Sequence, residues 1–172
     1  SSGGRAIAMG YDAAALNDVG TGYFDLAYTW LTQEPALPGK TIPEGDVAMI
    51  IRGSAQFSSP NLTEEETALR NLLVLDGYGI TYVNFAQVAN SDLSSAAAVV
   101  AASGPGLSKN QVEHFLQSGL NIGLFGSAGD GVEATWDGST SSSYRTFTPV
   151  WTGGIFSNED SIFLQNGGTA YY

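Results

Sequence analysis

Short runs of apolar residues alternate with stretches of helical periodicity along the first three quarters of the chain. Near-continuous apolar runs predict strands that are covered on both faces, as in a parallel sheet. The predicted strands are residues 6–9, 47–51, 80–85, 97–102 and 122–125. Because a helix separates most of these runs, the pattern predicts a doubly wound, mostly parallel α/β sheet with flanking helices.

Three segments between the runs have the spacing of amphipathic helices. Their inward stripes are Phe24, Ala27, Tyr28 and Leu31, then Ala68, Leu69, Leu72 and Leu73, then Val112, Phe115 and Leu116. Capping boxes begin the second helix at Thr63 and the third at Ser108, since each is followed three residues later by Glu or Gln. Gly77 and Gly119 are expected to end these two helices.

The length of 172 residues is ordinary for one folding unit, so we expect a single α/β domain. Its parts are a strand–helix unit over 1–34, a Pro- and Gly-rich linker over 35–45, the main α/β core over 46–129 and a loop-rich β extension over 130–172. Residues 127–148 are predicted to form a long surface loop or an insertion. Short strands are predicted at 162–164 and 169–172.

The amino-acid composition limits the classes of binding partner and the cellular location that we expect for this protein. Seventeen acidic and six basic side chains give a net charge of −11, which repels nucleic acid and anionic membranes. The absence of cysteine excludes a disulfide framework, a thiolate zinc site and a cysteine nucleophile. A chain with two lysines and abundant Ser, Thr and Gly is typical of exported, extracellular or salt-adapted proteins. We therefore expect an extracellular or cell-surface location without membrane insertion.

Residues 97–127 combine an apolar strand, a Gly-rich turn, the helix motif Leu-Ser-x-x-Gln-Val-x-x-Phe-Leu-x-x-Gly and a second apolar strand ending in Phe-Gly-Ser. This pattern resembles class I glutamine amidotransferase-like domains, in particular their ThuA-like and secreted versions. Residues 47–85 resemble the opening strand–helix–strand of that family, and residues 4–30 resemble its closing strand and helix. The resemblance implies a flavodoxin-like, amidotransferase-like α/β fold.

Two features depart from the family. The segment that resembles the closing strand and helix comes first here, which implies a circular permutation, with excision from tandem domains and exchange of termini between copies as alternatives. In catalytic members the strand that matches 122–125 delivers a nucleophilic cysteine. Here the turn reads Phe-Gly-Ser-Ala-Gly, and Ser127 is the nucleophile nearby.

Ser127 and His114 are the weak catalytic candidates. The turn around Ser127 half matches the Gly-x-Ser-x-Gly elbow of serine hydrolases, and His114 is the single histidine that could act as a base. His114 is expected midway along the preceding helix, whereas ligands of open α/β sheets bind at the C-terminal edge of the strands. This placement favours a solvated helix residue over a triad base.

The acidic region after residue 129 offers two further hypotheses. Asp130, Glu133 and Asp137 could give Ca²⁺ the hard oxygen ligands it prefers, although the two Asp-Gly pairs at 130–131 and 137–138 favour simple turns. Trp136, Tyr144 and Trp151 are candidate ligand-binding residues, because exposed aromatic rings stack on sugars or pack against proteins. They could equally close one end of the sheet.

These features favour a non-catalytic extracellular module, structural or adhesive, that acts through protein–protein contact or self-association. We expect no cofactor apart from Ca²⁺ at the acidic region. Two alternatives stay open. One is a serine hydrolase or glycan-active enzyme that uses Ser127, and the other is a carbohydrate-binding module that uses Trp136 and Trp151.

Overall fold

A computed structural model describes residues 4–9, 11, 13–33, 47–56, 58–102, 109–129, 144–146 and 169–171. The strands are β1 (Ala6–Met9), β2 (Val47–Ile51), β3 (Ile80–Asn84), β4 (Ala98–Ala101), β5 (Ile122–Phe125), β6 (Tyr144–Thr146) and β7 (Thr169–Tyr171). The helices are α1 (Asp18–Thr32), α2 (Glu64–Leu75) and α3 (Lys109–Gln117), with short 3-10 helices η1 (Ala13–Ala15), η2 (Phe85–Asn90) and η3 (Gly126–Gly129). The five strands and three helices predicted before residue 126 are confirmed.

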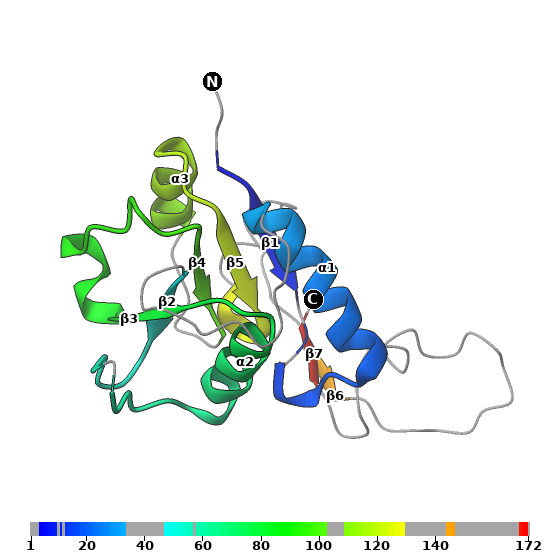
Figure 1. The fold of residues 1–172 in the computed structure, drawn as a ribbon. Helices are drawn as coiled ribbons and strands as arrows, with labels where there is room; N and C mark the ends of the chain where they lie inside the picture. Colours follow the sequence, from blue (N-terminus) through cyan, green and yellow to red (C-terminus); the bar gives the residue numbers. More distant parts are fainter. Residues whose placement is uncertain are drawn as a thin grey trace, which may run out of the picture.

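Five strands form one sheet in the order β1-β5-β4-β2-β3, and every neighbouring pair is parallel (Figure 1). The predicted doubly wound α/β class is therefore confirmed. When the strands are counted from β2, this is the 2-1-3-4-5 order of flavodoxin-like sheets, with β1 in the place of the last strand. Ala6 consequently pairs with Ile122, far away along the chain.

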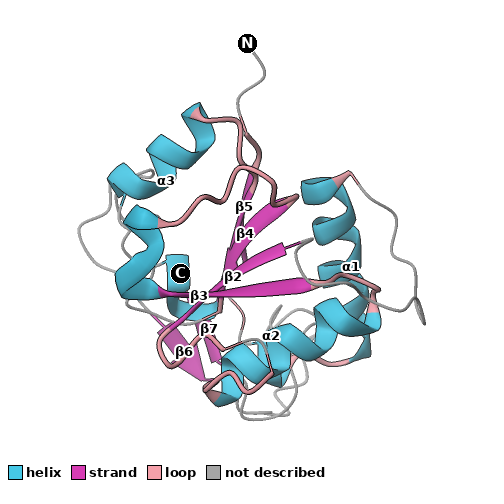
Figure 2. Ribbon diagram, turned by 60° about the vertical axis from the view of Figure 1, so that its left-hand side comes forward, coloured by secondary structure: helices cyan, strands magenta, loops and turns pink. Residues whose placement is uncertain are grey.

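Both faces of the sheet are covered, as the apolar strands predict. Figure 2 shows α1 and α2 on one side of the strands and α3 on the other. In β2, alternate side chains enter two different cores: Val47, Met49 and Ile51 pack with α1 and α2, and Ala48 and Ile50 pack with α3 and η2. Alternation of side chains along each strand thus divides the apolar interior into two layers.

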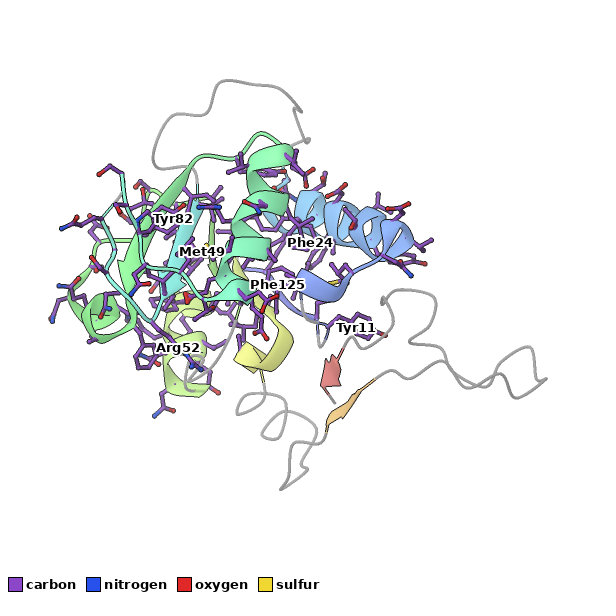
Figure 3. All side chains as sticks on the ribbon, turned by 90° about the horizontal axis from the view of Figure 1, so that it is seen from below. Tyr11, Phe24, Met49, Arg52, Tyr82 and Phe125 are labelled. Carbon is purple, nitrogen blue, oxygen red and sulfur yellow. The ribbon has the colours of Figure 1, made fainter. Side chains whose placement is uncertain are left out.

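The helix α1 is held against the sheet by aromatic packing. Its N-cap, Asn17, accepts a hydrogen bond from the backbone N–H of Gly20 at 2.9 Å. Phe24 is fully buried, and its ring centroid lies 5.1 Å from that of Phe125 at the end of β5 (Figure 3). Tyr28 stacks on Phe24 at 5.7 Å. The unit formed by β1 and α1 is therefore continuous with the main core.

The helix α2 has the two ends that its sequence predicts. The Thr63 hydroxyl accepts from the N–H of Glu66 at 3.2 Å, and the Glu66 carboxylate accepts from the N–H of Thr63 at 3.3 Å, so the capping box is complete. At the other end Gly77 adopts a φ of 90°, a left-handed conformation that glycine reaches at little cost. Leu69 and Leu73 are fully buried, as expected.

The reading of residues 127–148 as a loop is wrong at two places. Residues 126–129 form η3, and residues 144–146 form β6, which pairs antiparallel with β7. Tyr and Thr in β6 favour strands, but their partner lies more than 20 residues further along the chain, so no local signal announces the pairing. The predicted linker over 35–45, the Ser108 capping box and the strand at 162–164 lie outside the described residues.

We predict that Phe24→Ala lowers the free energy of unfolding by about 3–5 kcal/mol, because it leaves a cavity between α1 and β5. Chemical denaturation followed by tryptophan fluorescence measures this change. Leu75→Ala is the control, since Leu75 lies exposed at the end of α2, and it should change stability by less than about 0.5 kcal/mol. Equal effects of the two substitutions would contradict the packing described for α1.

Candidate functional site

The carboxyl ends of the five parallel strands lie along one edge of the sheet, which is where open α/β sheets bind ligands. The chain leaves β2 towards β3 on one side and leaves β4 towards β5 on the other. The topological switch point therefore lies between the ends of β2 and β4. Arg52 and Gly53 follow β2 there, and Ala102 follows β4.

The side chain of Asn84 holds the turn after β2. Its Nδ2 donates to the carbonyl of Arg52 at 3.1 Å and to the carbonyl of Gly53 at 2.8 Å. Its Oδ1 accepts from the N–H of Ala86 at 2.9 Å, which also caps η2. Both the Nδ2 and the Oδ1 of Asn84 are thus hydrogen-bonded to backbone groups at the sheet edge.

Glu66 is the second polar group that fixes this edge. It is buried, and its carboxylate accepts from the N–H of Arg52 at 3.4 Å in addition to closing the capping box. A buried carboxylate is tolerated when backbone N–H groups surround it. Asn84 and Glu66 therefore act as structural groups of the switch point.

The described residues place Ser127 and His114 towards opposite ends of β5. Gly126 follows the carboxyl end of β5 with a left-handed φ of 56°, and Ser127 comes next, inside η3. His114 is exposed on α3, and its carbonyl accepts from the N–H and the Oγ of Ser118 where α3 ends. From there the chain enters the amino end of β5.

The remaining candidates fall mostly outside the described residues. Those outside are Asp130, Glu133, Trp136, Asp137 and Trp151. Tyr144 lies in β6, opposite Tyr171 of β7. Within the described ranges, no group of three or more His, Cys, Asp or Glu side chains could hold a metal ion. The calcium and sugar-stacking hypotheses stay predictions.

Two carboxyl groups that the sequence analysis missed meet beside the end of α2. Asp25 extends from α1 and Asp76 caps the C-terminus of α2, and their side chains share a hydrogen bond. Burial, that hydrogen bond and the charge of Asp25 raise the pKa of Asp76 to about 7. Asp25 Oδ1 and Asp76 Oδ2 are buried, and neither atom has a further hydrogen-bond partner.

The helix α1 carries a second apolar stripe that faces away from the sheet. We call Val19, Tyr23, Leu26 and Trp30 the outer face of α1. Each is exposed by half or more, and Leu26 by 70%. Among the described residues, the other large apolar side chains with comparable exposure are Val74 and Leu75 of α2. The spacing of four, three and four residues along this stripe is a helical signal that is present in the sequence.

A positively charged group borders the outer face of α1 at the C-terminal end of the helix. The guanidinium of Arg5 lies 4.9 Å from the ring centroid of Trp30 and donates to the carbonyl of Trp30 at 2.7 Å. This combines a cation–π contact with a positive charge at the C-terminal end of the helix, where the helix dipole favours it. The last turn of α1 is thereby tied to the segment that precedes β1.

Comparison of the chain with protein-family models, curated proteins and solved structures finds no match. The resemblance to amidotransferase-like domains therefore remains a prediction. No helix in the described ranges is long and apolar enough to span a membrane.

We predict that Gly53→Ala destabilises the domain, because a Cβ at this position would overlap the backbone oxygen of Asn61. The matched control is Gly22→Ala on α1, where a Cβ meets nothing within 4 Å. That substitution should raise stability by about 0.5–1 kcal/mol, since alanine is the better helix former. Thermal unfolding measures the melting temperature of both variants. An unchanged melting temperature for Gly53→Ala would contradict the tight turn described after β2.

We predict that the stability of the domain falls as the pH rises from about 4 through 7. The pKa of Asp76 is higher in the folded state than the ordinary value of 3.8, so the folded state binds more protons across this window. Asp76→Asn should flatten the decrease of the melting temperature between pH 5 and pH 8. Asp92→Asn is the control and should leave the decrease of the melting temperature unchanged. The exposed Asp92 has a lowered pKa and therefore titrates below pH 5.

Proposed function

We propose that this domain is a non-catalytic structural or adhesive module of the cell exterior that works by self-association. The outer face of α1 is the observation that carries this proposal. Contiguous exposed apolar side chains are uncommon on monomeric proteins and mark contact surfaces. Tyr and Trp, which make up half of this face, are also enriched among the residues that contribute most to protein–protein binding.

The outer face of α1 remains largely exposed in a single copy. The opposite side of the helix already buries Phe24, Tyr28 and Leu31 in the core. Amphipathic surface helices normally turn polar residues to the solvent on their other side. The part of each outer side chain that is still exposed, half or more of it, is buried only when another surface covers it.

Two further features support a structural role. At the switch point, Asn84 and Glu66 are occupied with backbone groups of the turn after β2. The turn that corresponds by resemblance to the catalytic cysteine carries Ser127 instead. An acidic, lysine-poor chain without cysteine fits an extracellular or cell-surface setting, where free thiols are oxidised.

Light scattering across a wide concentration range tests the proposal. The wild-type chain should show a mass that rises above the 17.9 kDa of the monomer as its concentration increases. Leu26→Ser should keep the monomer mass, because it places a hydroxyl in the middle of the outer face. Leu75→Ser is the matched control, since Leu75 is 68% exposed but lies on α2, and it should associate like the wild type.

Two outcomes would contradict this reading. A wild-type mass of one monomer at every concentration, up to the millimolar range, would remove self-association as the function. Equal association of Leu26→Ser and the wild type would show that the copies meet through a surface other than α1.

A further inference from the structure

The outer face of α1 matches itself when it is turned end for end. Val19 and Trp30 lie at equal distances from the midpoint of the stripe, and so do Tyr23 and Leu26. In an antiparallel pair of helices, Val19 of one copy faces Trp30 of the other, and Tyr23 faces Leu26. Each contact then places an aromatic ring against an aliphatic side chain, and no aromatic ring faces another ring.

We propose that the outer face of α1 binds the same face of a second copy in antiparallel orientation, about a twofold axis. This inference rests on the proposed self-association and specifies its geometry. A contact of this kind uses the same patch on both copies and closes after two. It therefore predicts a dimer as the building block, and a filament would need another surface.

Charge at the two ends of the helix selects the antiparallel orientation. Asp18 is exposed at the start of α1, and Arg5 lies beside Trp30 at its end. In the antiparallel pair each Asp18 approaches Arg5 of the other copy, so opposite charges meet at both ends. A parallel pair would set Asp18 against Asp18 and Arg5 against Arg5, and like charges repel.

Small side chains beside the stripe allow close approach. Gly22 and Ala27 are exchanged by the same twofold symmetry, and a Cβ on Gly22 would meet nothing within 4 Å. Two helices can therefore approach to about 8–10 Å between their axes. A helix of this length spans about 22 Å, which is short for a permanent interface of about 800 Å² a side. We expect a weak dimer that forms at high local concentration.

Cross-linking distinguishes the two orientations, since the chain contains no cysteine that could interfere. The experiment mixes full chains that carry Val19→Cys with full chains that carry Trp30→Cys under mild oxidation. An antiparallel pair joins the two variants as a mixed dimer. Each variant alone stays uncoupled, because its two cysteines would lie about 16 Å apart along the helix, beyond the roughly 7 Å that a disulfide allows between Cα atoms.

Charge reversal gives an independent readout by sedimentation equilibrium. Asp18→Arg and Arg5→Asp should each weaken the dimer by about 2- to 30-fold, the range for two exposed ion pairs. The double variant should recover most of the loss, because opposite charges meet again at both ends. The melting temperature of each variant, measured in dilute solution, separates loss of contact from loss of folding.

The outcomes separate this inference from the proposed function. Mixed dimers together with recovery in the double variant support the antiparallel pair. Same-variant dimers would overturn it in favour of a parallel pair, and a rising wild-type mass without any cross-link would assign the contact to another surface. In both of those cases self-association stands, whereas a wild-type chain that stays monomeric removes the proposed function itself.

Discussion

Parallel pairing of all five strands in the main sheet is the constraint on which the rest of the structure depends. Parallel neighbours need crossover connections, and these place helices over both faces. Every residue of β2 is consequently buried, with alternate side chains in two separate cores. The position of α1 follows from the same requirement, because Phe24 must pack on the sheet at Phe125. The packing of Phe24 on Phe125 also determines which side of α1 remains exposed to solvent.

Local signals made most of the sheet predictable. The apolar run of β2 and the Thr63–Glu66 capping box need no knowledge of distant residues, and both have the expected form. The pairing of β6 with β7 was unpredictable for the opposite reason, since two short strands must find each other across an unrelated segment. Asp76 likewise resembles any helix-terminal aspartate in the sequence. Its shifted pKa exists only because folding brings Asp25 against it.

The candidate site was predictable in part. Parallel strands place their carboxyl ends at one edge, so the neighbourhood of Ser127 could be foreseen from the fold class alone. The sequence of α1 contains two apolar stripes, and the stripe predicted to face inward, with Phe24, Tyr28 and Leu31, is the one that packs on the sheet. In the structure Phe24 packs on Phe125 and stacks on Tyr28, whereas Tyr23 and Trp30 of the other stripe each remain about half exposed. The exposure of this second stripe, on which the proposed contact surface is based, is seen only in the structure.

The place of β1 at the sheet edge has a consequence for how the chain folds. β1 pairs with β5 across more than 110 residues, so this step closes the longest loop in the sheet. Loop closure costs more entropy as the separation grows, and distant pairings form slowly. During synthesis β1 and α1 leave the ribosome well before β5 is made. Of the five strands in this sheet, β1 is therefore made before β5, the strand with which it pairs. Until β5 is made, Phe24 of α1 lacks its contact with Phe125.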